Sequence, residues 1–334
     1  MKREKTARVT VIVLTIISIL LCISLVVTII LFEEYKRNNS IPVSAKPQLK
    51  SELPSSSVAD AITTQSLKAY AQQYNVSVEF LQRFFNDVIV YKDSDQIVYA
   101  PIDEKLPKNP YDFKNLVYLD SEIQYQKNGV STGIKGIDVS KYQGDINWNK
   151  VKADHVKFAI IRIGFRGYQN GKITIDESCK KNIEGAIAAG IKVGVYFFSQ
   201  AITIEEVIQE ADTVLEYIKD YKITYPVVFD AEEILEENAR TNSLTTAQRT
   251  DITVAFCQKI KSAGYTPMIY ANVKWFVAKL DMSRLTMYDK WFAQYFKTPF
   301  FPYDFQMWQY TGKGKVDGIK GDVDLNICFK DYSK

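Results

Sequence analysis

Between residue 133 and the carboxyl end of the chain, short apolar runs alternate with amphipathic stretches. The apolar runs are continuous, which is typical of strands buried on both faces, and the amphipathic stretches predict helices. Repeated strand–helix units followed by further strands predict a parallel α/β barrel of the TIM type rather than an open sheet. The predicted strands are 136–140, 158–165, 192–199, 227–229, 268–271, 290–295, 305–310 and 323–327, and the predicted helices are 176–189, 203–221 and 246–263.

The longest apolar segment lies near the amino terminus. Residues 9–32 contain no charged residue, and a helix of this length reaches about 36 Å, enough to cross a bilayer. Basic residues within 1–8 favour a cytoplasmic amino-terminal tail. A cleaved signal peptide is the alternative, but the run is longer than such peptides need and no small-residue cleavage motif follows it. We therefore expect a single-pass anchor in the cell membrane, with the rest of the chain, after residue 32, extracellular.

The residues between this segment and the barrel are less strongly patterned. Residues 33–63 are polar and proline-containing, which predicts an extended extracellular spacer. Residues 64–104 predict a small module of two helices and a hairpin formed by 88–91 and 97–102. A module of this size buries little surface alone, so we expect it to lean on the barrel or on an envelope protein partner. Residues 105–132 predict a connector.

The two predicted helices of the small module carry many aromatic side chains. In the first helix, Leu67, Tyr70, Ala71 and Tyr74 repeat at helical spacing. Ser77 is a candidate cap for the second helix, whose expected apolar side consists of Phe80, Leu81, Phe84, Phe85 and Val88. Burial statistics favour core positions over a ligand platform for these rings.

Composition excludes several kinds of chemistry. The single histidine, His155, lies in a polar stretch that predicts a surface turn, which argues against Ser-His-Asp, Cys-His and histidine–zinc sites. The four cysteines are far apart, and no Gly-x-Gly-x-x-Gly motif opens a helix after a strand. The net charge of +3 gives no indication of nucleic-acid binding. We expect no cofactor and no metal, so catalysis must come from carboxylates.

Two acids follow the apolar run at 227–229. Asp230 and Glu232 are two residues apart, so on a strand both side chains point to the same face. Their mutual repulsion can separate their pKa values and provide one proton donor and one carboxylate, although ordinary ion pairing is the alternative explanation of the spacing. Asp138 and Asp324 belong to other predicted strands, and the strand ends of a barrel converge at one mouth.

Aromatic residues stand near the same predicted strand ends. Flat rings stack on the apolar faces of sugars while acids and amides bind the hydroxyl groups, so such a cleft suits a glycan; the alternative for each ring is burial in the barrel. The candidates for substrate binding are Tyr142, Tyr196, Phe198, Tyr270, Trp291, Tyr295, Trp308 and Tyr310.

Several of these segments together resemble a known family. The chain resembles glycoside hydrolase family 25, the Chalaropsis-type lysozymes, from about residue 133 to 331. The segments that carry the resemblance are Gly136-Ile137-Asp138-Val139-Ser140-Lys141-Tyr142-Gln143-Gly144, Ile146-Asn147-Trp148, Asp230-Ala231-Glu232, Trp308-Gln309-Tyr310 and Val323-Asp324-Leu325-Asn326.

The resemblance implies a function and a fold. It implies an N-acetylmuramidase that hydrolyses the β-1,4 bond between N-acetylmuramic acid and N-acetylglucosamine of bacterial peptidoglycan, on a flattened (β/α)5(β)3 barrel covering 133–334. Glu232 would be the general acid and base, Asp230 its assisting carboxylate, and Asp138 and Asp324 would line the same site. Tyr196 and Tyr270 match motif aromatics. The histidine frequent in the family near the strand at 192–199 is replaced here by phenylalanine.

Two rival functions remain open at this stage. One is a non-catalytic cell-wall binding or scaffold protein, and the other is a hydrolase of another N-acetylated glycan such as chitin. The presence of all four acids argues against the first. A tethered enzyme suggests local remodelling of the cell wall.

Overall fold

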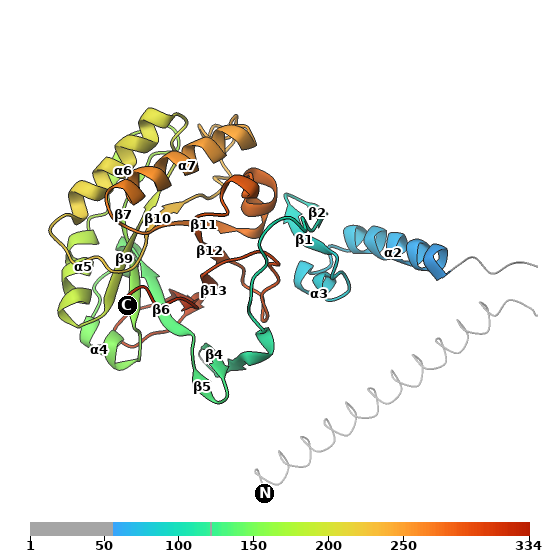
Figure 1. Ribbon diagram of the computed structural model, residues 1–334, viewed down its shortest axis with the longest axis horizontal. Coiled ribbons are helices and arrows are strands. Elements are labelled where there is room, and N and C mark those ends of the chain that lie inside the picture. The colour runs from blue at the N-terminus through green and yellow to red at the C-terminus, as the bar shows by residue number, and fades with distance from the viewer. Residues whose placement is uncertain (1–55, 121) are drawn as a thin grey trace, which may run out of the picture. The chain divides into compact units, whose positions relative to one another are not determined.

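Eight strands close into a barrel in the computed structural model, which describes residues 56–120 and 122–334 (Figure 1). Pairing of β6 with β7 completes the ring, and β14 is antiparallel to both of its neighbours, β13 and β6. The other neighbouring strands of the ring are parallel. Around the barrel the order is β6 (Ile134–Val139), β14 (Val323–Cys328), β13 (Met307–Gly314), β12 (Asp289–Ala293), β11 (Pro267–Asn272), β10 (Val227–Asp230), β9 (Lys192–Phe198) and β7 (Phe158–Arg166).

Helices connect the first six strands and lie outside them, from α4 at the lower left of Figure 1 to α7 at the top. They are α4 (Trp148–Ala153), α5 (Cys179–Ala188), α6 (Ile204–Ile218), α7 (Thr246–Ser262) and a π-helical turn at Trp275–Lys279. Side-chain caps start the longer ones: Thr203 accepts from the backbone N–H of Glu206, and Thr245 forms a capping box with Gln248. The predicted α/β barrel is therefore confirmed. Two short elements, α4 and β8 (Ile173–Ile175), were not predicted because neither is long enough for a periodic pattern.

Alternation along each strand divides the apolar residues into two cores. One core lies inside the barrel and includes Phe158, Val228 and Met268. The other lies between the strands and the helices and includes Val227 and Phe229. Since Val228 faces inward, Asp230 continues the inner face of β10. The Phe158 ring fills the space beside Gly136, where an added Cβ would lie 2.1 Å from the ring.

Residues 56–101 contain two helices and a hairpin. They are α2 (Ser56–Gln73), α3 (Val78–Gln82), β1 (Val88–Asp93) and β2 (Gln96–Pro101), so the predicted hairpin is present. The buried Gln82 amide fixes the turn between α3 and β1, donating to the carbonyls of Phe85 and Val88 and accepting from the N–H of Val90. The first helix begins at Ser56, earlier than the predicted end of the spacer at residue 63.

The aromatic residues of this module are only partly in its core. Tyr70, Tyr74, Phe80 and Phe84 are 56%, 60%, 49% and 58% exposed, whereas Ala71 is fully buried. Of the expected apolar side of the second helix, only Leu81 and Phe85 are buried. Phe80 and Phe84 each come one position before one of these buried residues. Neighbouring residues on a helix point about 100° apart, so Phe80 cannot share the core side with Leu81, and the helix itself ends at Gln82. Ser77 makes no side-chain capping bond.

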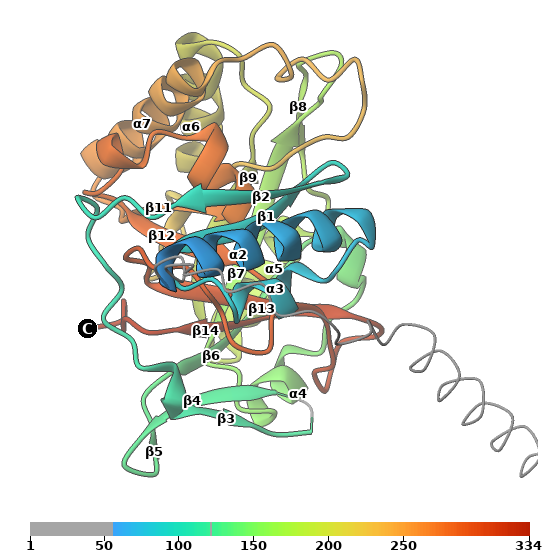
Figure 2. The same ribbon diagram turned by 90° about the vertical axis from the view of Figure 1, so that its right-hand side faces the viewer.

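The segment at 105–132 is more ordered than a connector. It forms a small antiparallel sheet of β3 (Leu116–Tyr118), β4 (Ile123–Lys127) and β5 (Val130–Ser131), seen together at the bottom of Figure 2. Leu116 and Tyr125 pack into the outer core of the barrel. Tyr111 stacks on Phe329 at 4.1 Å between ring centroids. These contacts involve residues about 200 positions apart, so local sequence patterns could not predict them.

No helix within residues 56–120 and 122–334 is long and apolar enough to cross a membrane. The predicted anchor at 9–32, the tail at 1–8 and most of the predicted spacer lie outside the described residues.

Candidate active site

The four predicted acids lie together in one cavity of about 230 Å³ at the mouth of the barrel. Side chains from most of the strands or from the segments that follow them line this cavity. The lining residues are Asp138, Val139, Ser140, Tyr142, Gln143, Arg162, Tyr196, Asp230, Glu232, Tyr270, Trp291, Tyr295, Gln309 and Asp324.

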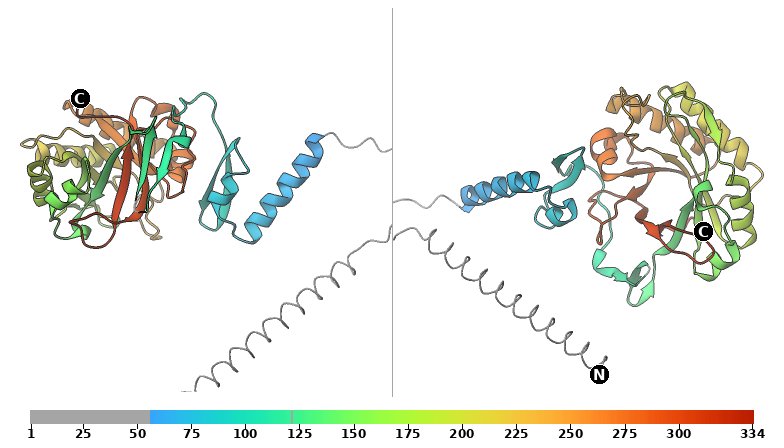
Figure 3. Two further views of the ribbon diagram at one scale, coloured as in Figure 1. Left: turned by 90° about the horizontal axis from the view of Figure 1, so that it is seen from below. Right: turned by 180° about the vertical axis from the view of Figure 1, so that it is seen from behind.

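Three of the acids lie on strands of the barrel, and Glu232 lies just after one. Asp138 is near the carboxyl end of β6, Asp230 is the last residue of β10, and Glu232 follows two residues later. Asp324, in contrast, lies at the amino end of β14. It reaches the same mouth because β14 is antiparallel to β6, which pairs Asp324 with Asp138; Figure 3 shows these two strands side by side. The expectation that all strands run in one direction was therefore wrong for β14.

Asp138 is the most strongly held of the four carboxylates. Its side chain is buried, and Oδ2 accepts hydrogen bonds from Gln309 Nε2 at 2.9 Å and from Asn326 Nδ2 at 2.8 Å. Burial and the neighbouring Asp324 raise the pKa of Asp138 well above its ordinary value, although the two hydrogen bonds act in the opposite direction. Asp138 thus binds the side-chain amides of both β13 and β14 at the cavity.

Asp230 and Glu232 form the acid pair that the sequence predicted. Asp230 is buried, and its Oδ1 has no hydrogen-bond partner among the described residues. Burial, followed by repulsion from Glu232, raises the pKa of Asp230 well above its ordinary value. Burial also raises the pKa of Glu232, with a further contribution from Asp324 and an opposing one from Asp230. Glu232 can therefore hold a proton at a higher pH than an exposed glutamate.

The ionisation of Asp324 predicts a pH-dependent stability. Burial raises the pKa of Asp324 from 3.8 to about 6. A carboxyl group whose pKa is higher in the folded state stabilises the fold while protonated, and this contribution is lost as the pH rises through about 6. We expect Asp324→Asn to increase the free energy of unfolding at pH 8 by about 1–2 kcal/mol relative to the unchanged chain, and to have little effect at pH 4.

Urea unfolding of both chains at pH 4, 6 and 8 measures this difference. Asp322→Asn is the matched control, because Asp322 lies in the same hairpin but is solvent-exposed and paired with Lys315. Parallel pH dependences for Asp324→Asn and the unchanged chain would show that Asp324 does not titrate as described.

Aromatic side chains form the walls above the acids. Tyr270 and Tyr295 both donate from their hydroxyls to Gln309 Oε1 at 2.8 Å, and Trp291 Nε1 donates to Asn326 Oδ1 at 2.8 Å. The two amides that hold Asp138 therefore also orient these rings. Tyr196 lines the same cavity, and Tyr142 and Tyr295 are exposed at its rim at 76% and 58%.

Three predicted substrate-binding residues lie elsewhere. Trp308 and Tyr310 belong to the outer core, because Gln309 between them faces inward. Trp308 Nε1 donates to the carbonyl of Gln294 at 2.9 Å, and the Tyr310 hydroxyl accepts from the N–H of Ile123. Phe198, at the end of β9, does not line the cavity. Trp308 and Tyr310 therefore lie on the face of β13 that points away from the cavity, whereas Phe198 shares the face of β9 that Tyr196 occupies but lies beyond the lining residues.

Five lining residues were not among the predicted site residues (Val139, Ser140, Gln143, Arg162 and Gln309), and two of them, Arg162 and Gln309, act on the predicted acids. Arg162 pairs with the buried Asp176, with 2.6 Å between Nη2 and Oδ2, and its guanidinium lies 5.1 Å from the centre of the Tyr142 ring. Its positive charge lowers the pKa of Asp230, opposing burial. Gln309 connects Asp138 to the aromatic wall. The available signal for both was a polar residue inside an otherwise apolar strand.

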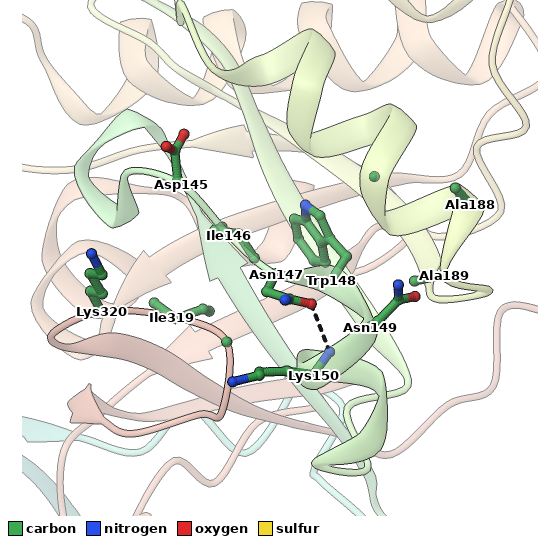
Figure 4. A pocket seen from close by; sticks show the side chains of 12 residues that line it. Asp145, Ile146, Asn147, Trp148, Asn149, Lys150, Ala188, Ala189, Ile319 and Lys320 are labelled. Atoms are coloured by element: carbon green, nitrogen blue, oxygen red, sulfur yellow. Dashed lines mark hydrogen bonds between the residues drawn. The ribbon is translucent and has the colours of Figure 1, made fainter.

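A larger cavity of about 800 Å³ lies away from the acids (Figure 4). None of the four acids lines it, and the bond from the N–H of Lys150 to Asn147 Oδ1 caps α4 at its wall. Its lining residues are Asp145, Ile146, Asn147, Trp148, Asn149, Lys150, Gly185, Ala188, Ala189, Gly318, Ile319 and Lys320. The smaller cavity, not this one, holds the carboxyl pair that the sequence predicted.

The smaller cavity has the features of a glycoside hydrolase site. Glycosidic bonds are cleaved by an acid that protonates the leaving oxygen and a negative group that stabilises the developing positive charge. A pair of neighbouring carboxyl groups can provide both, because repulsion lets one keep a proton while the other ionises, and here the pair lies beside aromatic side chains at the mouth of an α/β barrel.

The comparison with known families agrees with this class. The family described as Glycosyl hydrolases family 25 matches residues 137–319, more than half of the chain, and the chain belongs to this family. Lysozyme M1 of Streptomyces globisporus is 28% identical over 214 residues, which cover 59% of this chain and 68% of that protein. The predicted glycoside hydrolase of the lysozyme type is thereby confirmed.

Solved structures show the same fold. A bacterial lysozyme from Streptomyces coelicolor matches with a TM-score of 0.50 and 27% identity, covering 58% of this chain and 91% of that one. The modular autolysin LytC from Streptococcus pneumoniae, solved with a synthetic peptidoglycan ligand, matches with a TM-score of 0.55. At 22% identity, over 73% of this chain and 57% of that one, the second likeness concerns the fold alone.

Proposed function

We propose that this chain is an N-acetylmuramidase that hydrolyses the β-1,4 bond between N-acetylmuramic acid and N-acetylglucosamine in peptidoglycan. The supporting observation is the placement of Asp230 and Glu232 on one inner face of the barrel, in a cavity that also contains aromatic walls. The family membership and the lysozyme relatives support the same substrate class.

Glu232 is the proton donor in this proposal. Its partly exposed side chain and raised pKa allow it to carry a proton to the glycosidic oxygen. When the bond between the anomeric carbon and that oxygen breaks, the leaving sugar takes the proton and positive charge develops on the anomeric carbon. The resulting Glu232 carboxylate can then take a proton from the water that completes hydrolysis.

Asp230 assists through the substrate's own acetamido group. Its free Oδ1 is a buried acceptor without a partner among the described residues, and the acetamido N–H is a suitable donor. Accepting this hydrogen bond would orient the acetamido oxygen toward the anomeric carbon and stabilise the cyclic oxazolinium ion formed by its attack. Asp230 and Glu232 are two residues apart at the end of β10 and line the same cavity, so Asp230 cannot readily attack the opposite face of the sugar itself.

The products test both the substrate and the stereochemistry. Purified peptidoglycan should yield new reducing ends on N-acetylmuramic acid, and chitin should yield few or none. NMR in the first minutes should show the β-anomer, because two displacements at one carbon give net retention. Initial α-anomer would contradict acetamido participation, reducing ends on N-acetylglucosamine would contradict the bond assignment, and faster cleavage of chitin would favour the alternative glycan. Binding without any cleavage would favour a wall-binding protein.

The proposal includes a location at the cell membrane. The uncharged run at 9–32 is long enough to serve as an anchor, and it would keep the barrel close to the cell's own wall, where it would remodel peptidoglycan locally. Full-length protein should sediment with membranes and resist extraction by carbonate, and deletion of 9–32 should release it. Release of the intact protein by carbonate would argue against an anchor.

A further inference from the structure

The segment that carries Glu232 has few bonds of its own. After the N–H of Ala231, which donates to the carbonyl of Tyr270, the next backbone N–H in this loop with a backbone acceptor is that of Ala239. Leu235, between them, is 90% exposed. The far end of the loop is held separately, where the N–H of Arg240 donates to the carbonyl of Tyr168. The position of Glu232 therefore depends on side-chain contacts nearby.

Glu233 provides such a contact through Lys274. Lys274 Nζ lies 2.8 Å from Glu233 Oε1 and 2.7 Å from Oε2, so the carboxylate is bound through both oxygens. Lys274 follows β11 and is only 7% exposed. A buried ammonium group requires negative partners, because an unpaired charge is strongly unfavourable away from water. The Lys274–Glu233 pair thus restrains the residue directly after Glu232.

The second partner of Lys274 comes from the small amino-terminal module. Asp93, at the end of β1, places Oδ1 2.7 Å from Lys274 Nζ. The bond to Lys274 is the main cause of the lowered pKa of Asp93. Two carboxylates from separate parts of the chain therefore share one buried ammonium group, and Lys274 connects the hairpin of the module to the loop of the catalytic acid.

A further contact joins the module to the loop after β12, the strand next to β11. Glu79 Oε1, in α3, accepts from the backbone N–H of Lys297 at 3.0 Å. Lys297 is two residues after Tyr295, which lines the cavity. The module thus contacts both the loop after β11 and the loop after β12, which border the site on one side.

From these contacts we propose that residues 64–104 are a positioning element of the catalytic site, acting on the Glu232 segment through Asp93, Lys274 and Glu233. The inference rests on the proposed function, since it assumes that Glu232 donates the proton. Lys274 and Asp93 touch neither the sugar nor the reacting atoms. Their loss would misplace Glu232 without removing any catalytic group, and small misplacements of such a group have large effects on rate.

Single substitutions in the full-length chain test the coupling. We expect Lys274→Met to lower kcat on peptidoglycan about tenfold or more, and Asp93→Asn to lower it about threefold, with KM changed less than about twofold in both. Lys274→Arg should keep more activity than Lys274→Met, because arginine can bind both carboxylates. Lys259→Met is the matched control, since Lys259 pairs with Asp212 at 2.8 Å between the outer helices α7 and α6.

Hydrogen exchange supplies a readout that does not depend on activity. The hydrogen-bonded amides at the two ends of this loop, those of Ala231 and Ala239, should exchange faster in Asp93→Asn and Lys274→Met than in the unchanged chain, and should be unaffected in Lys259→Met. If Lys274→Met fails to fold, Asp93→Asn decides the question, because the Asp93 side chain is 37% exposed. Unchanged kcat and unchanged exchange in Asp93→Asn would overturn the proposal. An unchanged chain that does not cleave peptidoglycan would instead overturn the proposed function, while the exchange result would still test the coupling.

Discussion

Glu232→Gln is expected to lower kcat on peptidoglycan by about 10³-fold or more, since general acid catalysis contributes up to about 10⁴-fold. Glutamine keeps the size of the side chain but cannot deliver a proton to the glycosidic oxygen. The fold should be retained or slightly stabilised at neutral pH, because burial already disfavours the ionised form of Glu232. KM should change little, since Glu232 acts mainly in the transition state.

The comparison requires a control on the same loop. Glu237 is exposed, so Glu237→Gln makes the same chemical change without entering the cavity and should keep full activity. Turnover would be measured from the release of reducing ends, and folding from thermal unfolding. Retention of more than about a tenth of the kcat by Glu232→Gln would remove Glu232 from the role of proton donor.

The pH dependence follows from the same group. Glu232 must be protonated to donate, so activity should fall as the pH rises through its pKa. Burial raises the pKa of Glu232 above 4.5, the ordinary value for a glutamate, so the decline in activity should occur above pH 4.5. The residual activity of Glu232→Gln should not show this decline with rising pH.

Asp230→Asn is expected to lower kcat by about 10²-fold, which corresponds to the loss of one transition-state electrostatic interaction. Asparagine preserves the shape but removes the negative charge that stabilises the acetamido-derived cation. The effect should require the acetamido group: on de-N-acetylated peptidoglycan, Asp230→Asn and the unchanged chain should be about equally slow.

Exposed Asp220 offers the matched control, since Asp220→Asn changes an aspartate outside the cavity. The kcat of the unchanged chain divided by that of Asp230→Asn, measured on acetylated and on de-N-acetylated substrate, isolates the contribution of the bond between Asp230 and the acetamido group. An equally large ratio on both substrates would show that Asp230 acts by some route other than the acetamido group.

Local patterns in the sequence were sufficient for the barrel and the acids. Continuous apolar runs predicted the eight strands of the ring, because strands buried on both faces leave little room for polar residues. The spacing of Asp230 and Glu232 placed both on one face for the same geometric reason that governs any strand. The choice of carboxylate chemistry followed from a single histidine and four distant cysteines.

The direction of β14 and the side chosen by each ring depended on the tertiary structure. Asp324 reaches the mouth only because β14 is antiparallel to its neighbours, and no residue within 323–328 signals that direction. Trp308 and Tyr310 resemble wall aromatics in sequence, but pairing of the strands turns Gln309 inward and both rings outward. The stacking of Tyr111 on Phe329 and the bond between Asp93 and Lys274 also join residues remote in sequence.

The sequence alone thus determined which elements form and which chemical groups are available, because secondary-structure periodicity and side-chain chemistry are local properties. Only the tertiary structure decided which of those groups share the cavity. Strand direction, register and loop contacts arise from packing between distant segments, and packing sets the burial on which the raised pKa values of the acids depend.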